Sequence, residues 1–337
     1  MKKHLQTMVA IAIALSIAAP LSRAQDEREI DATKKLFAEA GGVAGVRRGT
    51  DGRYFVLASH QVLVYDGAGK VVSRFPAAPA GNAKLTPFFG LGIDVASDGK
   101  VYVADGAAGA IDIFNPDGTL IGKAPVSAPT SVAALPNGEM AVASSRDKTV
   151  ISVVDANGKT TREFGDPIDL VEETVVNRQL NAGQLVSDRE GNIFYAYSFV
   201  PEPTFRRYDR FGYAALNETL NTPEFQGEAQ YARKLIARQQ QSHSGSIPMR
   251  KTITAIGVDR ETQNIWIAME NLLLMFNKDA TEHQEFRAYT PESARLVINS
   301  ILVEPQRLIL CSDTLGAYEF ARPDKPAPAE KAETPHT

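Results

Sequence analysis

The chain has 337 residues, of which 44% are hydrophobic, 23% are charged and 8% are aromatic. Its 36 basic and 40 acidic residues give a formal net charge of −4, and it contains one cysteine and one tryptophan. These proportions are typical of a soluble globular protein and exclude a disordered, collagen-like or disulfide-stapled chain.

Residues 1–24 have the pattern of a secretory signal peptide. They begin with Lys2 and Lys3, continue with an apolar run from Met8 to Ala19, and end in the small-x-small sequence Ser22-Arg23-Ala24. The apolar run is shorter than the about 20 residues that span a bilayer, and no cysteine follows to carry a lipid. We therefore expect a secreted or periplasmic protein without stable membrane insertion, whose mature chain begins near residue 25.

The charge of this mature chain argues against nucleic acid as a partner. Removing Lys2, Lys3 and Arg23 leaves 33 basic and 40 acidic residues, which is a net charge of −7. Phosphate recognition relies on clustered Lys and Arg side chains, and an acidic chain does not favour it. The one cysteine, Cys311, cannot form an intrachain disulfide, and its place in the apolar run Leu308–Cys311 predicts a buried, inert thiol.

A repeated unit of about 40 to 50 residues predicts the fold. The unit is clearest at residues 92–118, where three short β-type runs alternate with Asp-Gly turns, which are strong hairpin signals. Asx side chains bond their own backbone and Gly accepts a positive φ, so these turns mark the same place in each unit. The first turn recurs as Asp51-Gly52, Asp98-Gly99, Asn137-Gly138 and Glu190-Gly191, and the second as Asp66/Gly69, Asn115/Gly118, Asp155/Gly158 and Asp209/Gly212.

Six such units fit the chain, and four strands per unit make each one a propeller blade. Their second strands are expected at Tyr54–Ala58, Val101–Ala104, Glu139–Ala143, Ile193–Tyr197, Ile265–Ala268 and Leu308–Cys311. The sixth unit lacks a fourth strand, and we expect Lys34–Ala40 to supply it, which closes the ring and removes an open edge. The alternative is a helix over Glu29–Ala40.

The run Gly92–Asp105 resembles the NHL-repeat signature, in which a Gly-Ile-x-Val strand, an Asp-Gly turn and a Tyr-Val-Ala-Asp strand follow one another. The resemblance is partial in the other units and poor in the sixth. It implies an all-β, six-bladed propeller of the NHL type, in the broad group that includes gluconolactonase-like and amidating-lyase-like enzymes. That group is functionally mixed, so the fold by itself carries no activity. We assign residues 25–322 to one propeller domain and residues 323–337 to a flexible Pro/Ala/Glu-rich tail.

Two long connections between blades predict short helices on one face of the propeller, here called the loop-rich face. Asp166-Pro167 begins the first, Ile168–Leu180, with Asp as the helix cap before a proline. Thr222-Pro223 begins the second, Glu224–Gln241, whose apolar residues fall on one side of a helix. These helices either cap the central channel or form the wall of a binding pocket.

Few residues in the sequence point to a catalytic or metal-binding site. A calcium site needs several oxygen ligands from different blades, and the inner-strand positions equivalent to Asp94 supply no second carboxylate, so such a site is not expected. These positions are Arg47, Ala133, Val186, Gly257 and Ile301. Four histidines remain in the mature chain, too scattered to predict a zinc site. We expect Arg47 and Asp94 to form an ion pair in the channel. Other polar residues on the loop-rich face include Glu202, Glu270, Asn271 and Ser144.

We therefore expect an exported, non-catalytic and monomeric propeller without metal or cofactor, which binds a protein, peptide or carbohydrate on its loop-rich face. The candidate ligand-binding residues are Arg47, His60, Asp94, Arg146, Arg178 and Asp313. The alternative is a hydrolase or lyase with its site at the mouth of the central channel, where Arg47 and Asp94 would meet the substrate.

Overall fold

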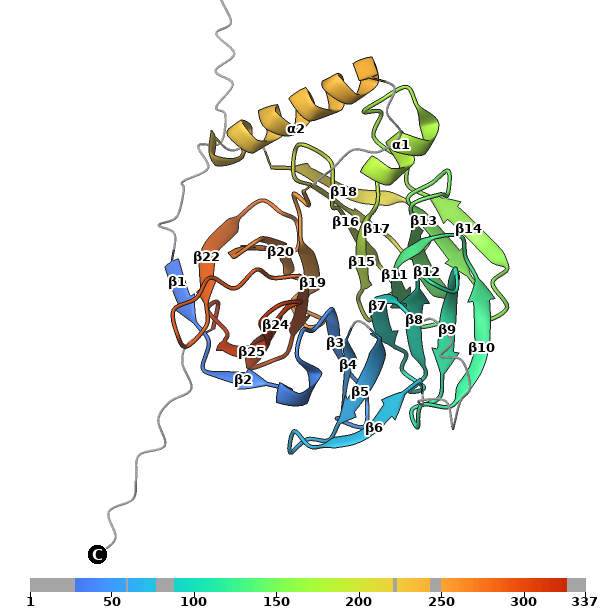
Figure 1. Ribbon diagram of the computed structural model, residues 1–337, viewed down its shortest axis with the longest axis vertical. Coiled ribbons are helices and arrows are strands. Elements are labelled where there is room, and N and C mark those ends of the chain that lie inside the picture. The colour runs from blue at the N-terminus through green and yellow to red at the C-terminus, as the bar shows by residue number, and fades with distance from the viewer. Residues whose placement is uncertain (1–27, 59, 77–87, 221–222, 243–249, 326–337) are drawn as a thin grey trace, which may run out of the picture.

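The computed structural model describes residues 28–58, 60–76, 88–220, 223–242 and 250–325. The segment that we predict to be a signal peptide and nearly all of the predicted tail lie outside these ranges. Within them, 25 strands form six sheets, which are arranged as blades around a central axis (Figure 1). The chain is a six-bladed β-propeller, as the repeat and the NHL-type resemblance predict.

In each blade four strands form an antiparallel sheet, and the first of its strands in the blade order lies nearest the axis. Blade one comprises β3 (Gly45–Arg48), β4 (Tyr54–Ala58), β5 (Gln61–Tyr65) and β6 (Val71–Phe75). Blade two comprises β7 (Gly90–Val95), β8 (Val101–Asp105), β9 (Ala110–Phe114) and β10 (Leu120–Pro125). Blade three comprises β11 (Pro129–Ala134), β12 (Met140–Ser144), β13 (Ile151–Val154) and β14 (Thr160–Phe164). All these strands follow the chain order within their blade.

The remaining blades keep the same plan with two additions from the N-terminal segment. Blade four comprises β15 (Gly183–Ser187), β16 (Ile193–Tyr197), β17 (Thr204–Tyr208) and β18 (Ala214–Thr219). Blade five comprises β19 (Ala255–Val258), β20 (Ile265–Met269), β21 (Leu272–Phe276), β22 (His283–Tyr289) and the added β1 (Arg28–Asp31). Blade six comprises β23 (Ser300–Val303), β24 (Arg307–Ser312), β25 (Gly316–Ala321) and the added β2 (Lys34–Leu36). The six predicted second strands are β4, β8, β12, β16, β20 and β24, each within one residue of its expected bounds.

The hairpin turns form where the sequence pattern predicts them. In blade two, Gly99 has a φ of 86° and Gly118 a φ of 91°, a region that side chains other than glycine rarely adopt. The Asp98 carboxylate accepts a hydrogen bond from the backbone N–H of Lys100 at 3.1 Å. Turn chemistry encoded over four residues thus defines each strand reversal through contacts within the turn itself.

The core lies between the blades. The middle strands of every blade are almost entirely buried, and six apolar clusters fill the six junctions between neighbouring blades. Near the axis the inner strands approach closely, so that a Cβ atom on Gly257 would lie 2.8 Å from the Ile301 side chain. The central channel accordingly keeps a cavity of only about 30 Å³, enough for about one ordered water. A cavity of this size does not hold a drug-sized ligand.

The N-terminal segment closes the ring, as predicted. Strand β2 pairs antiparallel with β25, with Lys34 opposite Glu319 and Leu36 opposite Ala317. The strand is shorter than expected, because Ala38–Ala40 forms a 3₁₀ turn (η1), and no helix spans residues 29–40. Strand β1, which the sequence did not predict, pairs in parallel with β22 of blade five. One segment therefore covers the outer edges of two adjacent blades.

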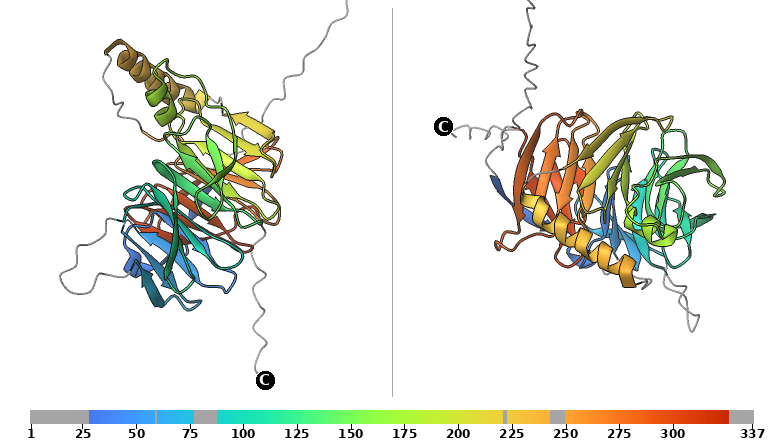
Figure 2. Two further views of the ribbon diagram at one scale, coloured as in Figure 1. Left: turned by 90° about the vertical axis from the view of Figure 1, so that its right-hand side faces the viewer. Right: turned by 90° about the horizontal axis from the view of Figure 1, so that it is seen from above.

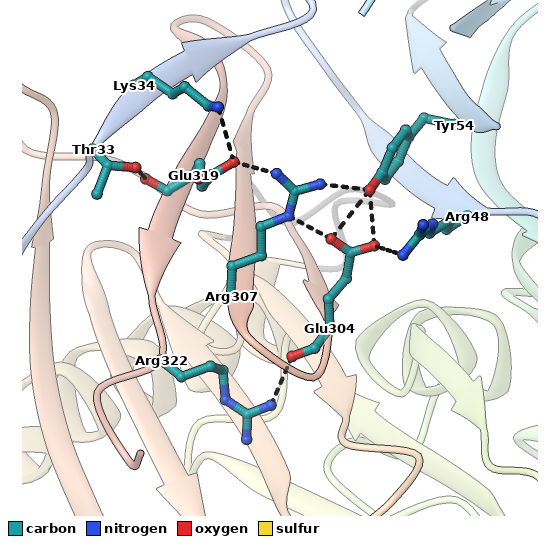
Figure 3. A network of polar contacts seen from close by, with 8 residues as sticks. All are labelled: Thr33, Lys34, Arg48, Tyr54, Glu304, Arg307, Glu319 and Arg322. Atoms are coloured by element: carbon teal, nitrogen blue, oxygen red, sulfur yellow. Dashed lines mark hydrogen bonds and ion pairs between the residues drawn. The ribbon is translucent and has the colours of Figure 1, made fainter. Parts of the chain in front are cut away.

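A network of polar side chains joins the first and last blades (Figure 3). It lies around the β3–β4 and β23–β24 turns, at the strand ends opposite to those that the helical inserts join. The Glu304 carboxylate accepts hydrogen bonds from Arg48 at 3.0 Å, from the Tyr54 hydroxyl at 2.9 Å and from Arg307 at 2.6 Å. Arg307 also contacts Glu319, which pairs with Lys34 at 3.6 Å. This network, here called the closure network, connects blade one, blade six and β2.

Both predicted helical inserts lie on the same side of the disc (Figure 2). Helix α2 (Pro223–Ser242) matches its predicted range within one residue at each end. Helix α1 is confined to Thr174–Leu180, and its cap residue is Glu173, so the predicted start at Asp166 is wrong. The two helices contact each other through an apolar cluster that contains Val176, Leu180 and Ile236. Together they form a raised wall on the loop-rich face.

Candidate functional site

The loop-rich face carries a cavity of about 370 Å³ over blade five, here called the blade-five pocket. Its wall comes from the β20–β21 turn, from residues 250–252 before β19, from the start of α2 and from the neighbouring loop of blade four. Lining residues that matter below are Phe225, Arg250, Lys251, Glu270, Asn271 and Arg287. Segments far apart in the sequence therefore meet here because each ends or turns on the same face.

The β20–β21 turn is held in an uncommon backbone conformation. Glu270 has a φ of 57°, in the left-handed region that residues other than glycine rarely adopt. Its backbone is fixed on both sides, because its N–H donates to Thr254 Oγ1 at 3.2 Å and its carbonyl accepts from the Ile298 N–H at 2.9 Å. Local strain of this kind persists only where the surroundings impose it, and it is concentrated at functional sites.

Asn271, the next residue of this turn, has a polar group without a partner. The residue is only 6% exposed, and its Nδ2 atom has no hydrogen-bond acceptor among the residues that the structure describes. Its backbone carbonyl, in contrast, accepts a bond from the Ala288 N–H at 3.0 Å. Nearly all buried polar groups in proteins are hydrogen-bonded, so an unsatisfied amide that lines a pocket needs an explanation.

The blade-five pocket is rich in positive charge. Arg250, Lys251 and Arg287 line it, against one carboxylate, Glu270, which accepts a hydrogen bond from Arg250 at 2.9 Å. Lys251 is exposed overall, and its amino group forms no hydrogen bond or ion pair with the described residues. Desolvation by the surrounding protein lowers the pKa of Lys251, and the nearby Asp313 carboxylate opposes this shift.

A second cavity of about 300 Å³, here called the α2 pocket, lies along the helix. Phe225 borders both cavities, so the two adjoin. The α2 pocket is also lined by the apolar Leu220 and by the carboxamides of Gln226 and Gln230. Its two charged residues, Arg233 and Glu202, form an ion pair with each other. The two cavities therefore differ in character, since one is cationic and the other is neutral and amide-rich.

The predicted pair of Arg47 and Asp94 is present as an ion pair. Arg47 Nε lies 3.3 Å from an Asp94 carboxylate oxygen, and the second oxygen accepts a bond from the Ala134 N–H at 2.8 Å. Both residues lie near the end of their inner strands that leads into the first hairpin turn, whereas the inserts join the opposite ends. The pair therefore connects blades one, two and three away from the blade-five pocket.

The other four predicted site residues lie on loops or on helix α1 of the loop-rich face, and none lines either pocket. His60 is exposed, with Nδ1 3.2 Å from the Phe88 carbonyl oxygen. Arg178 of α1 donates to the Arg146 carbonyl at 3.0 Å, so these two residues are in contact. Asp313 is exposed on blade six and acts on Lys251 through its charge.

Glu202, Glu270 and Asn271 are recognisable in the sequence as polar residues of this face, but they were not among the predicted ligand-binding residues. The sequence marks Phe225 only as an apolar residue of the predicted helix, and it gives no signal for Lys251. Both residues are unremarkable in the sequence, and their importance depends on where the chain enters and leaves α2. A conformational signal for Glu270-Asn271 was available, since only two residues separate the apolar runs of β20 and β21.

Three further observations concern the described part of the chain. Its residues contain no group of three or more His, Cys, Asp or Glu side chains arranged to hold a metal ion. None of its helices is long and apolar enough to cross a membrane. Cys311 is fully buried, as predicted, and burial raises the pKa of its thiol to about 12. A thiol with so little thiolate at neutral pH is a poor nucleophile.

No protein-family model and no curated protein matches the chain, but solved structures resemble its fold. A catalytically inactive virginiamycin B lyase from Staphylococcus aureus, solved with quinupristin, has a TM-score of 0.54 at 11% identity, covering 82% of this chain and 79% of the other. The selenomethionine-substituted form of that lyase has a TM-score of 0.52 at 12% identity, with 86% and 98% covered. A streptogramin B lyase gives 0.52 at 13% identity, with 85% and 84% covered. At such low identity the likeness establishes the propeller fold and nothing about activity.

Proposed function

We propose that this chain is an exported binding protein whose loop-rich face takes a protein, peptide or carbohydrate ligand in the two adjoining pockets beside α2. Its mature part would be a single propeller domain over residues 25–322. One observation carries the proposal: Phe225 borders two cavities of about 370 and 300 Å³, sizes that are typical of ligand sites. The strained turn at Glu270 and the unsatisfied Asn271 amide support the same location.

In this proposal, α2 is a recognition element as well as a cover for blade five. The helix packs partly on blade five through Phe225 and partly on α1 through Ile236. It thereby forms one wall of both cavities, while the loops of blades four and five form the other. Arg146, Arg178 and Asp313, which lie on the same face outside both pockets, would then border the ligand and not form its pocket.

The test is selection of ligands from a displayed random-peptide library and from a glycan array, with Phe225→Ala as the variant. The matched control is Phe211→Ala, because Phe211 is 62% exposed in a turn on the opposite face. We expect wild type and the control to select the same ligands and Phe225→Ala to bind them at least ten-fold more weakly, with thermal unfolding confirming that all three fold. Equal binding by all three, or no selection by wild type, would contradict the proposal.

A hydrolase or lyase remains the second candidate, and the lowered pKa of Lys251 is the observation that favours it. An amine that gives up its proton more readily than usual can serve as a general base. Virginiamycin B lyase and streptogramin B lyase share the fold, although identity of 11% to 13% transfers no reaction. Incubating each selected ligand with the protein and following its mass would distinguish the two functions. Cleavage that Lys251→Met abolishes would favour the enzyme.

A further inference from the structure

We propose that the blade-five pocket recognises a carboxylate of a peptide, with the Lys251 ammonium group and the Asn271 side-chain amide as its hydrogen-bond donors. This inference rests on the proposed binding function and names the chemistry of the ligand. In this inference, one charged group of the ligand, and not the shape of the pockets, is the feature that selects the partner.

The first argument is charge. Three cationic side chains, those of Arg250, Lys251 and Arg287, line the pocket, and Lys251 is the one whose amino group makes no hydrogen bond or ion pair with the described residues. The Asp313 carboxylate acts on Lys251 through its charge. The whole chain is acidic, with a formal charge of −4, so a cationic pocket departs from the average of its surface. A ligand that brings a negative charge is therefore favoured over a neutral or cationic one.

The second argument is unused hydrogen-bonding capacity. An ammonium group donates three hydrogen bonds and accepts none, and Lys251 makes none with the described residues. The Asn271 Nδ2 atom is buried and lacks an acceptor, which costs folding free energy. It is covered in the unliganded protein, so the side chain must rotate to meet a ligand. A carboxylate is an acceptor without donors, and it complements both groups.

The third argument concerns the adjoining α2 pocket, which favours a peptide as the carrier of that carboxylate. Its lining carboxamides, Gln226 and Gln230, offer donors and acceptors of the kind that a peptide backbone needs, next to apolar Leu220. Sugars are usually bound by stacking on aromatic rings, and among the described residues that line the two cavities Phe225 is the one aromatic residue. A peptide with its carboxylate on blade five and its chain along α2 fits both pockets.

The carboxylate can come from the C-terminus of the peptide or from an Asp or Glu side chain. Three pools of N-acetylated synthetic pentapeptides distinguish these sources: free C-terminal acids without Asp or Glu, C-terminal amides that include Asp and Glu, and C-terminal amides without them. Each pool is passed over the full chain, and retained sequences are identified by mass spectrometry. We expect the first or the second pool to be retained at least ten-fold over the third, and the pool that is retained identifies the source.

Variants then test the site. Lys251→Met should reduce retention of the carboxylate pool to that of the third pool, and Asn271→Asp should do the same by placing a negative charge beside the ligand. Lys234→Met is the matched control, because Lys234 is an exposed lysine of α2 that lines neither pocket. We expect it to retain peptides as wild type does.

The failures are distinguishable. Equal retention of all three pools overturns the carboxylate inference while peptide binding stands. Retention of no pool overturns peptide binding and the inference with it. Wild-type retention by both Lys251→Met and Asn271→Asp overturns the assignment to this pocket, even if carboxylate selection is seen. Should one variant fail to fold, the other still decides the assignment.

Discussion

Lys251 is a residue whose local environment opposes its own charge. Desolvation lowers its pKa from the ordinary 10.5, with Asp313 acting in the other direction. Between the lowered pKa and 10.5, the unfolded chain binds a proton that the folded chain has lost, so the free energy of unfolding increases with pH across that window. The protein thus maintains a charged group at some cost in stability, which is a common property of binding sites.

The affinity for a carboxylate peptide should decrease with pH, whereas the free energy of unfolding increases. We expect binding to weaken as pH rises through the lowered pKa of Lys251, because the ammonium charge is lost there. The other charged residues near this amine are Arg250, Arg287, Glu270 and Asp313, and Lys251 is the one lysine among the described residues that line the pocket. The measurement is the dissociation constant of a retained peptide from neutral to alkaline pH. Lys251→Arg should extend tight binding to higher pH, and an unchanged pH profile in that variant would contradict the assignment.

Asp94 illustrates a charged residue with a structural role. Its side chain is 5% exposed, forms an ion pair with Arg47 and accepts a hydrogen bond from the backbone of blade three. We expect Asp94→Ala to lower the free energy of unfolding by about 3 kcal/mol, since it leaves a buried arginine without its counter-ion. Denaturant unfolding measures this loss, and ligand binding should be unchanged in the folded variant.

Asp98→Ala is the matched control for that change. Asp98 belongs to the same hairpin, but its pair with Lys100 is exposed, with side-chain exposures of 53% and 42%. Exposed ion pairs contribute less than about 1 kcal/mol. If Asp94→Ala were as stable as the control and lost ligand turnover, the enzyme candidate with a channel site would replace the structural interpretation.

At the scale of elements, the N-terminal strands β1 and β2, here called the latch, cover two sheet edges. Strand β1 covers β22 and β2 covers β25, and both are short. Removing them would expose two rows of unpaired backbone groups, which are templates for pairing with other chains. The latch therefore provides protection against aggregation in addition to a few backbone hydrogen bonds.

We expect a chain that begins at residue 37 to aggregate at concentrations where a chain that begins at residue 28 stays monomeric. Size-exclusion chromatography with light scattering measures the difference. Hydrogen exchange provides a second readout, because the backbone amides of Lys34 and Leu36 should be protected in the longer chain. Fast exchange at these positions, or a monomeric shorter chain, would show that the latch is not needed for closure.

Helix α1 shows how side chains can override a helical pattern. The spacing of apolar residues favours a helix from Ile168, yet residues 168–173 are not helical. The Asn177 carboxamide oxygen accepts from the backbone N–H of Leu170 at 2.9 Å, and Asn181 bonds both backbone groups of Ile168. These bonds satisfy the backbone of the preceding segment in a loop, and the helix begins only where they end.

At the scale of the whole molecule, ring closure depends on contacts between the two ends of the chain. Glu304 and Tyr54 are 250 positions apart and meet at the junction of blades six and one. Burial raises the pKa of Tyr54, and the Glu304 carboxylate raises it further, so the hydroxyl stays protonated as a donor. Once this junction forms, every blade has a neighbour on both sides. A specific polar network at this position therefore holds the first and the last blade together.

We expect Glu304→Gln to lower the free energy of unfolding by about 2 kcal/mol, because Arg48 and Arg307 lose the charge that both contact. Glu39→Gln is the control, since its pair with Arg74 is exposed and should change stability by less than about 0.5 kcal/mol. Urea unfolding of both variants is the measurement. A loss in the control as large as in Glu304→Gln would mean that the closure network has no special role.

The sequence by itself determined the blades. Turn residues and apolar runs act within a few positions of each other, so Asp98-Gly99 or the run Ile193–Tyr197 predicts its element without knowledge of the rest. The missing fourth strand of the last blade likewise predicted where β2 pairs. The ion pair of Arg47 with Asp94 followed from placing equivalent positions on adjacent inner strands.

Only the tertiary structure decided the pockets, the length of α1 and the second latch strand. Lys251, Asn271 and Phe225 come from three separate segments, and nothing in their sequence spacing brings them together. Their proximity depends on how α2 lies across blade five, which is set by apolar packing between elements and not by any local pattern. The unsatisfied amide and the desolvated amine are consequences of that packing, because burial and partners exist only once the segments have met.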